Sequence, residues 1–208
     1  MRVKTEKMRK HFVFTAGELF IEQGFANVSM EMIAHKAKKS KVTLYNYYAN
    51  KDDLLKAYIL EIGKDLLEGI PKILLKQGNS VSETLTELAR AYLSITTFQE
   101  IVELNRLMIS EAKRFPELVK YYYEHGPHQV FLYMTEVLQY LMDQQLLIKA
   151  DKTLMARQFK TLCDGKFMEA QLWRLITTEN FNEQDMDIHI QQSVSAFLSI
   201  YQVKKVAV

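Results

Sequence analysis

Residues that break regular structure are scarce in this chain. Its 208 residues include only 7 glycines and 3 prolines. An all-β architecture with many turns would need more of them, whereas few breakers leave room for long helices. The length allows one large domain or a small domain joined to a larger one, and we favour the second arrangement. We therefore expect an all-α fold.

Cysteines and long apolar runs are lacking too. Cys163 is the single cysteine, and its spacing from Phe159 and Phe167 predicts a buried apolar group rather than a nucleophile. The first ten residues alternate in charge and have no signal-peptide core. No stretch reaches the roughly 18 uninterrupted apolar residues of a membrane span. We expect a cytoplasmic protein that does not cross the membrane.

Motifs for catalysis and for metal binding are also missing. The sequence has no glycine-rich nucleotide loop, no H-E-x-x-H helix and no G-x-S-x-G elbow. His125 and His128 beside Glu124 could suggest a metal site, but Gly126-Pro127 predicts a helix break that would separate the ligands. The expectation is a binding protein with no catalytic residues, metal or cofactor.

Positive charge is concentrated near the N-terminus. Residues 1–60 contain eleven lysines and arginines against six acidic residues, whereas the rest of the chain contains 16 against 19. Within residues 36–51 lie five lysines, three tyrosines and the hydroxyls of Ser40 and Thr43. Lysines attract phosphates, and tyrosine and threonine hydroxyls add directional hydrogen bonds. Charge alone fits either a polyanion-binding surface or an ordinary solvated one.

Apolar spacing predicts a helix over 4–23 ended by Gly24, and a short helix after Ser29 as N-cap. A break at 38–40 precedes a third segment over 41–48. A fourth helix, with Asn50 as its N-cap, starts at 51 and stops before Pro71. Two short helices joined by a short turn and packed on a longer first helix form a helix-turn-helix. Further helices are predicted at about 82–97, 100–114, 116–124, 127–146, 152–177 and 184–204.

In the third segment, Leu44 and Tyr48 share one face and are expected to be buried. The remaining face is the expected contact set, which comprises Lys41, Thr43, Tyr45, Asn46 and Tyr47. A short helix of this kind fits the major groove of DNA.

A set of positions across these helices resembles the N-terminal DNA-binding domain of the TetR/AcrR family of regulators. The residues that carry the resemblance are Phe12, Ala16, Leu19-Phe20, Gly24-Phe25, Ser29, Ile33-Ala34, Ala37, Ser40-Lys41, Thr43-Leu44-Tyr45, Tyr48, Lys51 and Leu54. The resemblance implies a helix-turn-helix domain over residues 1–50 and an effector-binding and dimerisation domain over 51–208.

The resemblance also implies roles for individual residues. It places Lys41, Thr43 and Tyr45 at DNA-contacting positions, Tyr47 and Lys51 at phosphate-contacting positions, and Ser29 near a phosphate. With Ser40 and Asn46, these residues form the expected DNA-binding set. Lys38-Lys39 departs from the family, which usually has Gly-Val in the turn, so a side chain must adopt a backbone conformation that glycine adopts more easily. Val42 replaces a small residue, which puts the closeness of the DNA approach in doubt.

A second stretch resembles the C-terminal domain of an AefR-like or AcrR-like branch of the same family. It consists of Arg106-Leu107-Met108-Ile109, Glu111-Ala112, Arg114-Phe115-Pro116-Glu117-Leu118 and Gly126-Pro127. This resemblance implies that the last two helices pair with those of a second copy and that earlier helices enclose a ligand cavity. Effector candidates are Phe98, Met108, Tyr122, Phe131 and Met134, although such residues also suit a plain core. Dimer-interface candidates are Leu162, Trp173, Val194, Phe197, Leu198 and Tyr201, and a bundle within one subunit suits their apolar members equally.

These observations predict a homodimeric, ligand-responsive repressor that binds a near-palindromic DNA operator and is released by a small apolar effector. The alternative on the same fold is an effector-independent architectural or cell-cycle factor. A metal-dependent or cysteine enzyme is the rival from another class, and it predicts that changes at His125, His128 or Cys163 abolish activity.

Overall fold

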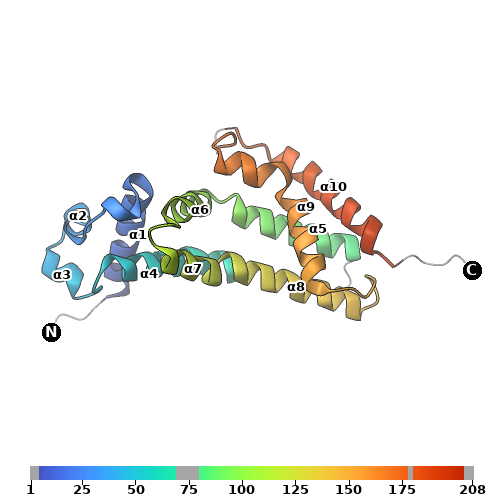
Figure 1. Cartoon of the computed structure of the whole chain (residues 1–208), viewed down its shortest axis with the longest axis horizontal. Coiled ribbons are helices and arrows are strands. Elements are labelled where there is room, and N and C mark those ends of the chain that lie inside the picture. Colours follow the sequence, from blue (N-terminus) through green and yellow to red (C-terminus); the bar gives the residue numbers. More distant parts are fainter. Residues whose placement is uncertain (1–4, 69–79, 178–179, 204–208) are drawn as a thin grey trace, which may run out of the picture. The chain divides into compact units, whose positions relative to one another are not determined.

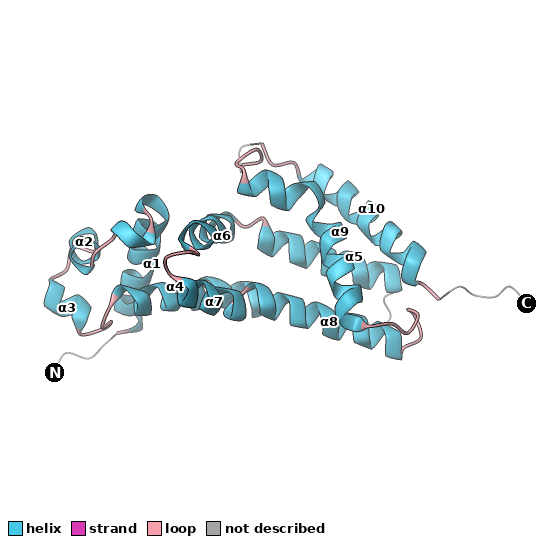
Figure 2. Ribbon diagram, viewed as in Figure 1, coloured by secondary structure: helices cyan, strands magenta, loops and turns pink. Residues whose placement is uncertain are grey.

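The computed structural model describes residues 5–68, 80–177 and 180–203, and these residues are predominantly helical (Figures 1 and 2). The elements are α1 (Glu6–Gln23), the 3-10 turn η1 (Phe25–Asn27), α2 (Met30–Lys36), α3 (Lys41–Tyr45), α4 (Lys51–Glu68), α5 (Val81–Thr96), α6 (Gln99–Glu111), α7 (Pro116–His125), α8 (Pro127–Asp143), α9 (Lys152–Leu172) and α10 (Glu183–Tyr201). The expected all-α fold is confirmed. No helix in the described part of the chain is long and apolar enough to cross a membrane.

The helices pack into two compact units, and neither unit is one continuous stretch of chain. The first unit comprises residues 1–65 and 103–127, and the second comprises 66–102 and 128–208. Helices α4, α6 and α8 therefore each contribute residues to both units. The expected domain boundary after residue 50 stays a prediction.

The core of the first unit is built from α1 to α4. Phe12 and Phe20 of α1, Ile33 of α2, Leu44 of α3 and Leu54 of α4 are all fully buried. Their spacing along each helix puts the apolar residues on one face, and burying those faces against each other holds the short α2 and α3 helices, which would not be stable alone.

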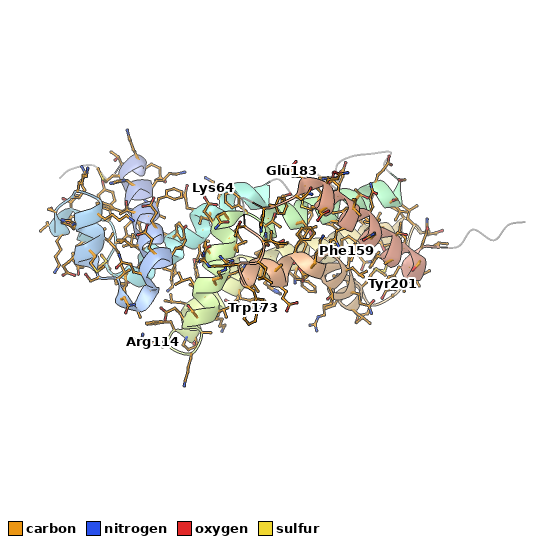
Figure 3. All side chains as sticks on the ribbon, turned by 90° about the horizontal axis from the view of Figure 1, so that it is seen from above. Lys64, Arg114, Phe159, Trp173, Glu183 and Tyr201 are labelled. Atoms are coloured by element: carbon orange, nitrogen blue, oxygen red, sulfur yellow. The ribbon has the colours of Figure 1, made fainter. Side chains whose placement is uncertain are left out.

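The second unit buries one face each of α5, α8, α9 and α10. Phe159 of α9 and Phe197 of α10 meet edge to face, with ring centroids 4.9 Å apart, and Phe197 also lies against Tyr201 at 4.8 Å. Figure 3 shows Phe159 and Tyr201 on these two adjacent helices. Such aromatic pairs add to the stabilisation from burial alone.

Helix α9 departs from the uninterrupted helix expected over 152–177. Gly165 has φ 35° and ψ −129°, which kinks the helix. A Cβ atom at this position would lie 2.3 Å from Cε1 of His189 in α10, so only glycine leaves room for that ring. His189 Nε2 lies 2.9 Å from the Cys163 carbonyl, and the Ser193 hydroxyl donates to the Leu162 carbonyl at 2.9 Å. His189 and Ser193 of α10 thus contact carbonyl groups next to the kink.

The other boundaries agree with expectation to within a few residues. Ser29 and Asn50 are N-caps as predicted, since their side-chain oxygens accept hydrogen bonds from the amides of Met32 and Asp53 at 3.3 and 2.9 Å. Gly24 ends α1 with φ 83°, as expected of a position that favours glycine. Pro71, the expected stop after α4, lies outside the described residues.

Candidate DNA-binding surface

Helix α3 is fixed to the first unit by its apolar side. Ser40 caps it, because the Ser40 hydroxyl oxygen accepts a hydrogen bond from the Thr43 amide at 3.1 Å. Leu44 is fully buried, and Tyr48, just after the helix, is 7% exposed. The two residues expected to anchor this segment are therefore buried, and Lys41 and Tyr45 on the other side of the helix are exposed.

The outward side combines cationic, polar and apolar groups. Lys41, Tyr45 and Asn46 are exposed, and Thr43 is half-buried with its hydroxyl 2.8 Å from that of Ser40. Val42 is 71% exposed, and sequence reasoning did not count it among the contacts. The signal was present, because an apolar residue off the buried face of a short helix is free to contact the methyl group of thymine.

The turn between α2 and α3 contains the strained position that the sequence predicted. Lys38 has φ 53°, in the left-handed region that favours glycine. Its amide donates to the His35 carbonyl, and the Lys39 amide donates to the Ala34 carbonyl, both at 3.0 Å. This is the Schellman pattern of helix ends, with lysine where glycine is usual. The turn therefore presents two exposed lysines beside α3.

The five lysines of the basic segment fall into different environments. Lys36 contacts Glu18 and Glu22 of α1 at 3.3 and 3.1 Å. Lys41 pairs with Glu31 of α2, and that hydrogen bond raises the pKa of Lys41 and lowers the pKa of Glu31. Lys38 and Lys39 are exposed. The cations that face outward around α3 are Lys38, Lys39 and Lys41, and a phosphate would have to compete with Glu31 for Lys41.

Lys51 differs from its expected role as a phosphate contact. Its ammonium group donates to the carbonyl oxygens of Phe25, Val28 and Ala26 at 2.7, 3.0 and 3.3 Å. It also lies 4.5 Å from the centre of the Phe25 ring, and burial lowers its pKa. Three carbonyls of η1 and of the residue that follows it converge on this group, and that of Phe25 also accepts a hydrogen bond from the Val28 amide at 3.4 Å. The geometry therefore gives Lys51 a structural role.

Two other expected phosphate contacts are also engaged within the protein. The Ser29 hydroxyl oxygen is the N-cap of α2. The Tyr47 hydroxyl oxygen accepts a hydrogen bond from the Thr5 amide at 3.2 Å, and its ring packs 5.5 Å from Phe12. Their contacts with DNA stay predictions, and each residue also holds the start of a helix.

The effector candidates do not gather in one described pocket. Met108 and Tyr122 are buried in the first unit, where the Tyr122 hydroxyl donates to Asn105 at 2.7 Å. Met134 is buried in the second unit, Phe131 packs against that unit's core, and Phe98 is 41% exposed. The structure assigns Met108, Tyr122 and Met134 to cores, so an effector site built on them stays a prediction.

The dimer candidates divide between core and surface. Val194, Phe197 and Tyr201 are at most 7% exposed within their own chain, so little of these side chains is left for a second copy. Leu162 and Leu198 are partly buried against the same core. Trp173, which follows α9, is 73% exposed (Figure 3). The candidates predicted on α10 lie on its apolar face, and this face packs against the core of the same chain.

Comparison with known proteins matches both parts of the chain. A family model described as bacterial regulatory proteins of the tetR family matches residues 15–58. A second, described as the C-terminal domain of an AefR-like transcriptional repressor, matches residues 83–203. The uncharacterised HTH-type transcriptional regulator YdeS of Bacillus subtilis (strain 168) is 32% identical over 85 residues, a match that spans 41% of this chain and 40% of that protein.

Solved structures match over nearly the whole chain. A crystal structure of a TetR-family transcriptional regulator from Mesorhizobium loti MAFF303099 has a TM-score of 0.84 and 25% identity, covering 97% of this chain and 100% of that one. The flavonoid-responsive regulator FrrA has a TM-score of 0.81 and 28% identity with the same coverage. SmeT in complex with triclosan shares the fold at a TM-score of 0.72 and 17% identity, covering 98% of this chain and 95% of that one.

Proposed function

The chain belongs to the TetR family of bacterial transcriptional regulators, and from that premise we propose that it is a ligand-responsive repressor acting as a homodimer. Each subunit places α3 in the major groove of a near-palindromic operator, with the two half-sites about one helical turn apart. A small apolar effector releases the protein by favouring a conformation in which both heads no longer fit.

The surface of α3 is the observation that carries this proposal. Leu44 and Tyr48 are locked into the first unit, so α3 has a fixed orientation. Lys41 and Tyr45 face outward, next to the exposed lysines of the turn. A rigid helix with cations at its start and polar side chains along its free face meets the requirements for contacting phosphates and base edges together.

The effector class is proposed by likeness to a relative. FrrA, which is 28% identical over 97% of this chain, is described as flavonoid-responsive. We therefore propose that the effector of this protein is a small, largely apolar molecule of comparable aromatic character. The aromatic and methionine content of α6 to α8 is compatible with such a ligand.

Selection of genomic DNA fragments by the purified protein tests the proposal most directly. We expect a short palindromic site to be enriched, and a panel of aromatic compounds that includes flavonoids to release the protein from it. Failure to enrich any site would refute the DNA-binding proposal. Stable binding that no compound of the panel weakens would favour the effector-independent architectural factor.

A pair of lysine variants separates phosphate contacts from structural contacts. The affinity for the selected site is expected to fall steeply with salt, and Lys41→Ala should reduce the log-log slope by about one for each phosphate that it no longer neutralises. Lys51→Ala should weaken binding without changing this slope, because the ammonium group of Lys51 donates to the carbonyls of the connector between α1 and α2. Fluorescence anisotropy at four or more salt concentrations measures both. A reduced slope for Lys51→Ala would restore this residue to the phosphate-binding set.

A further inference from the structure

The connector between α1 and α2 is held by two oppositely charged side chains. Oε1 of Glu111, at the end of α6, accepts a hydrogen bond from the Ala26 amide at 3.1 Å. On the carbonyl side, the ammonium group of Lys51 donates to Phe25, Ala26 and Val28. Glu111 thus accepts a hydrogen bond from an amide of η1, and Lys51 donates hydrogen bonds to carbonyls of η1 and of Val28.

Aromatic packing joins the same elements. The Phe25 ring is fully buried and meets the Phe115 ring edge to face, with centroids 4.9 Å apart. Phe115 follows α6 by a few residues, so the end of α6 contacts η1 through both a hydrogen bond and a ring. Residues more than 80 positions apart in sequence are therefore held against one another within the first unit.

The burial of Glu111 indicates that its place is specific. Glu111 is only 8% exposed, although carboxylates are normally exposed to water. A buried charge is costly unless hydrogen bonds and an opposite charge compensate it. The Ala26 amide supplies the hydrogen bond. Burial lowers the pKa of Lys51, and the negative charges of Asp52 and Glu111 raise it, so Lys51 supplies the opposite charge.

The connector determines where α2 begins. Val28 directly precedes Ser29, the N-cap of α2, and its carbonyl is one of those bound by Lys51. Helix α2 in turn packs on α3 through buried residues, and its carbonyls accept hydrogen bonds from the amides of Lys38 and Lys39 in the turn. A shift of η1 would therefore move α2, and with it α3, which packs on α2.

We propose that Glu111 is a positioning residue for DNA binding: by its hydrogen bond to η1, it fixes α2 and α3 in the geometry that binds DNA. This inference rests on the proposed function of the α3 surface. The end of α6 then acts on the helix-turn-helix through the connector before α2, in addition to the covalent connection through α4.

Three substitutions at Glu111 separate the hydrogen bond from the charge. Glu111→Gln keeps an acceptor oxygen at the same reach and removes the charge. Glu111→Asp keeps the charge but is one methylene shorter, so its oxygen no longer reaches the Ala26 amide. Glu111→Ala removes both. Glu136→Ala is the matched control, because Glu136 is an exposed glutamate in the middle of α8.

Binding to the duplex selected from the genome is the first measurement, made well below the melting temperature of each variant. We expect Glu111→Gln and Glu136→Ala to bind like the wild type, and Glu111→Asp and Glu111→Ala to bind roughly tenfold more weakly, a typical coupling between distant groups. The salt slope should stay unchanged, because every lysine that neutralises a phosphate is still present. A variant that was only less stable would bind normally at this temperature.

Hydrogen exchange provides a second measurement that needs no DNA. In Glu111→Asp and Glu111→Ala, the amides of Ala26 and Met32 should exchange roughly tenfold faster than in the wild type, because η1 and the first turn of α2 open more often. Amides of α9 and α10 should be unaffected. If Glu111→Ala does not fold, the comparison of Glu111→Asp with Glu111→Gln decides the matter.

Two outcomes would overturn the inference. In one, Glu111→Asp binds DNA like the wild type and Glu111→Gln does not, so the charge is what counts. In the other, all three variants bind and exchange normally. Failure of the wild type to bind any duplex would refute the proposed function instead, and the exchange data would still report on the contact between α6 and η1.

Discussion

At the scale of single residues, three helix ends within the described residues have a non-glycine residue in the left-handed backbone conformation. Lys38 after α2, Gln145 after α8 and Arg174 after α9 have φ values of 53°, 58° and 59°. At each, the amide of the following residue donates back to the helix, to Ala34, Leu141 and Ala170 respectively. A side chain in this conformation costs roughly 1 to 2 kcal/mol relative to glycine. These positions are therefore sites where glycine should stabilise the fold.

Lys38→Gly and Gln145→Gly form a matched pair for testing this. Each should raise the free energy of unfolding by about 0.5 to 1 kcal/mol, since relief of strain exceeds the added freedom of the unfolded chain. Only Lys38→Gly should weaken DNA binding, because it removes an exposed cation beside α3. Urea unfolding and anisotropy measure the two effects. Equal stability of Lys38→Gly and the wild type would show that the turn is not strained.

At Gly165 we expect the opposite effect, because here it is the loss of a glycine that should destabilise the fold. Gly165→Ala would place a Cβ atom 2.3 Å from the His189 ring at a residue with φ 35°, so it should destabilise the protein by about 2 to 4 kcal/mol. Adding His189→Ala should recover part of this destabilisation, because it removes the clash and leaves the backbone strain. Thermal unfolding of the two single variants and the double variant tests the coupling. Strict additivity would exclude the clash as the cause.

At the scale of elements, local sequence rules predicted the helices well. N-caps, breakers and apolar spacing act within a few residues, and Ser29, Asn50 and Gly24 are placed as expected. The kink of α9 was missed because its cause, the His189 ring, is 24 residues away in sequence. The internal contacts of Lys51 could not be foreseen for the same reason, since its three carbonyl partners lie more than 20 residues away, and its contact with a phosphate stays a prediction. Contacts between distant segments are not visible in spacing.

The N-terminus of α5 gives a pH-dependent prediction. Ser80 and Glu83 form a capping box, in which Glu83 accepts from the Ser80 amide at 2.7 Å and Ser80 accepts from the Glu83 amide at 3.2 Å. The hydrogen bond from the Ser80 backbone lowers the pKa of Glu83 below its ordinary 4.5. A carboxylate with a lowered pKa in the folded state stabilises the fold above its unfolded pKa, and this contribution is lost as the pH falls through the folded pKa.

Glu83→Gln isolates this contribution. Urea unfolding from pH 7 to pH 3 should show the wild type more stable than the variant at neutral pH, with a difference that shrinks below pH 4.5. The direction is fixed by the lowered pKa of the folded state. A difference that grows on acidification would contradict the capping box.

At the scale of the whole molecule, the proposed dimer needs an apolar surface that is not already buried in the core of the subunit. The expected candidates Val194, Phe197 and Tyr201 are buried within the subunit. Among exposed apolar residues of α10, Ile188 is 47% and Ile200 is 60% exposed. Sequence periodicity identified the apolar face of this helix, but it could not tell which face packs within the chain and which is left over.

Ile200→Glu tests whether the surface of α10 around Ile200 joins two subunits. A charge buried at a subunit interface is strongly unfavourable, so the variant should sediment as a monomer and lose operator affinity. Ile109→Glu is the control, because Ile109 is 64% exposed in α6 and should leave the sedimentation unchanged. A dimeric Ile200→Glu protein would move the interface away from this face.

The interleaving of the two compact units along the chain limits how the protein can be dissected. The fragment 1–65 contains all of α1, η1, α2 and α3, yet it lacks Glu111 and Phe115, which come from the later stretch 103–127. Cutting the gene at any point from codon 65 to codon 110 would therefore yield a head whose connector has lost both its carboxylate acceptor, Glu111, and its aromatic cover, Phe115. A DNA-binding fragment that keeps these contacts and omits residues 66–102 would have to join the stretches 1–65 and 103–127 directly.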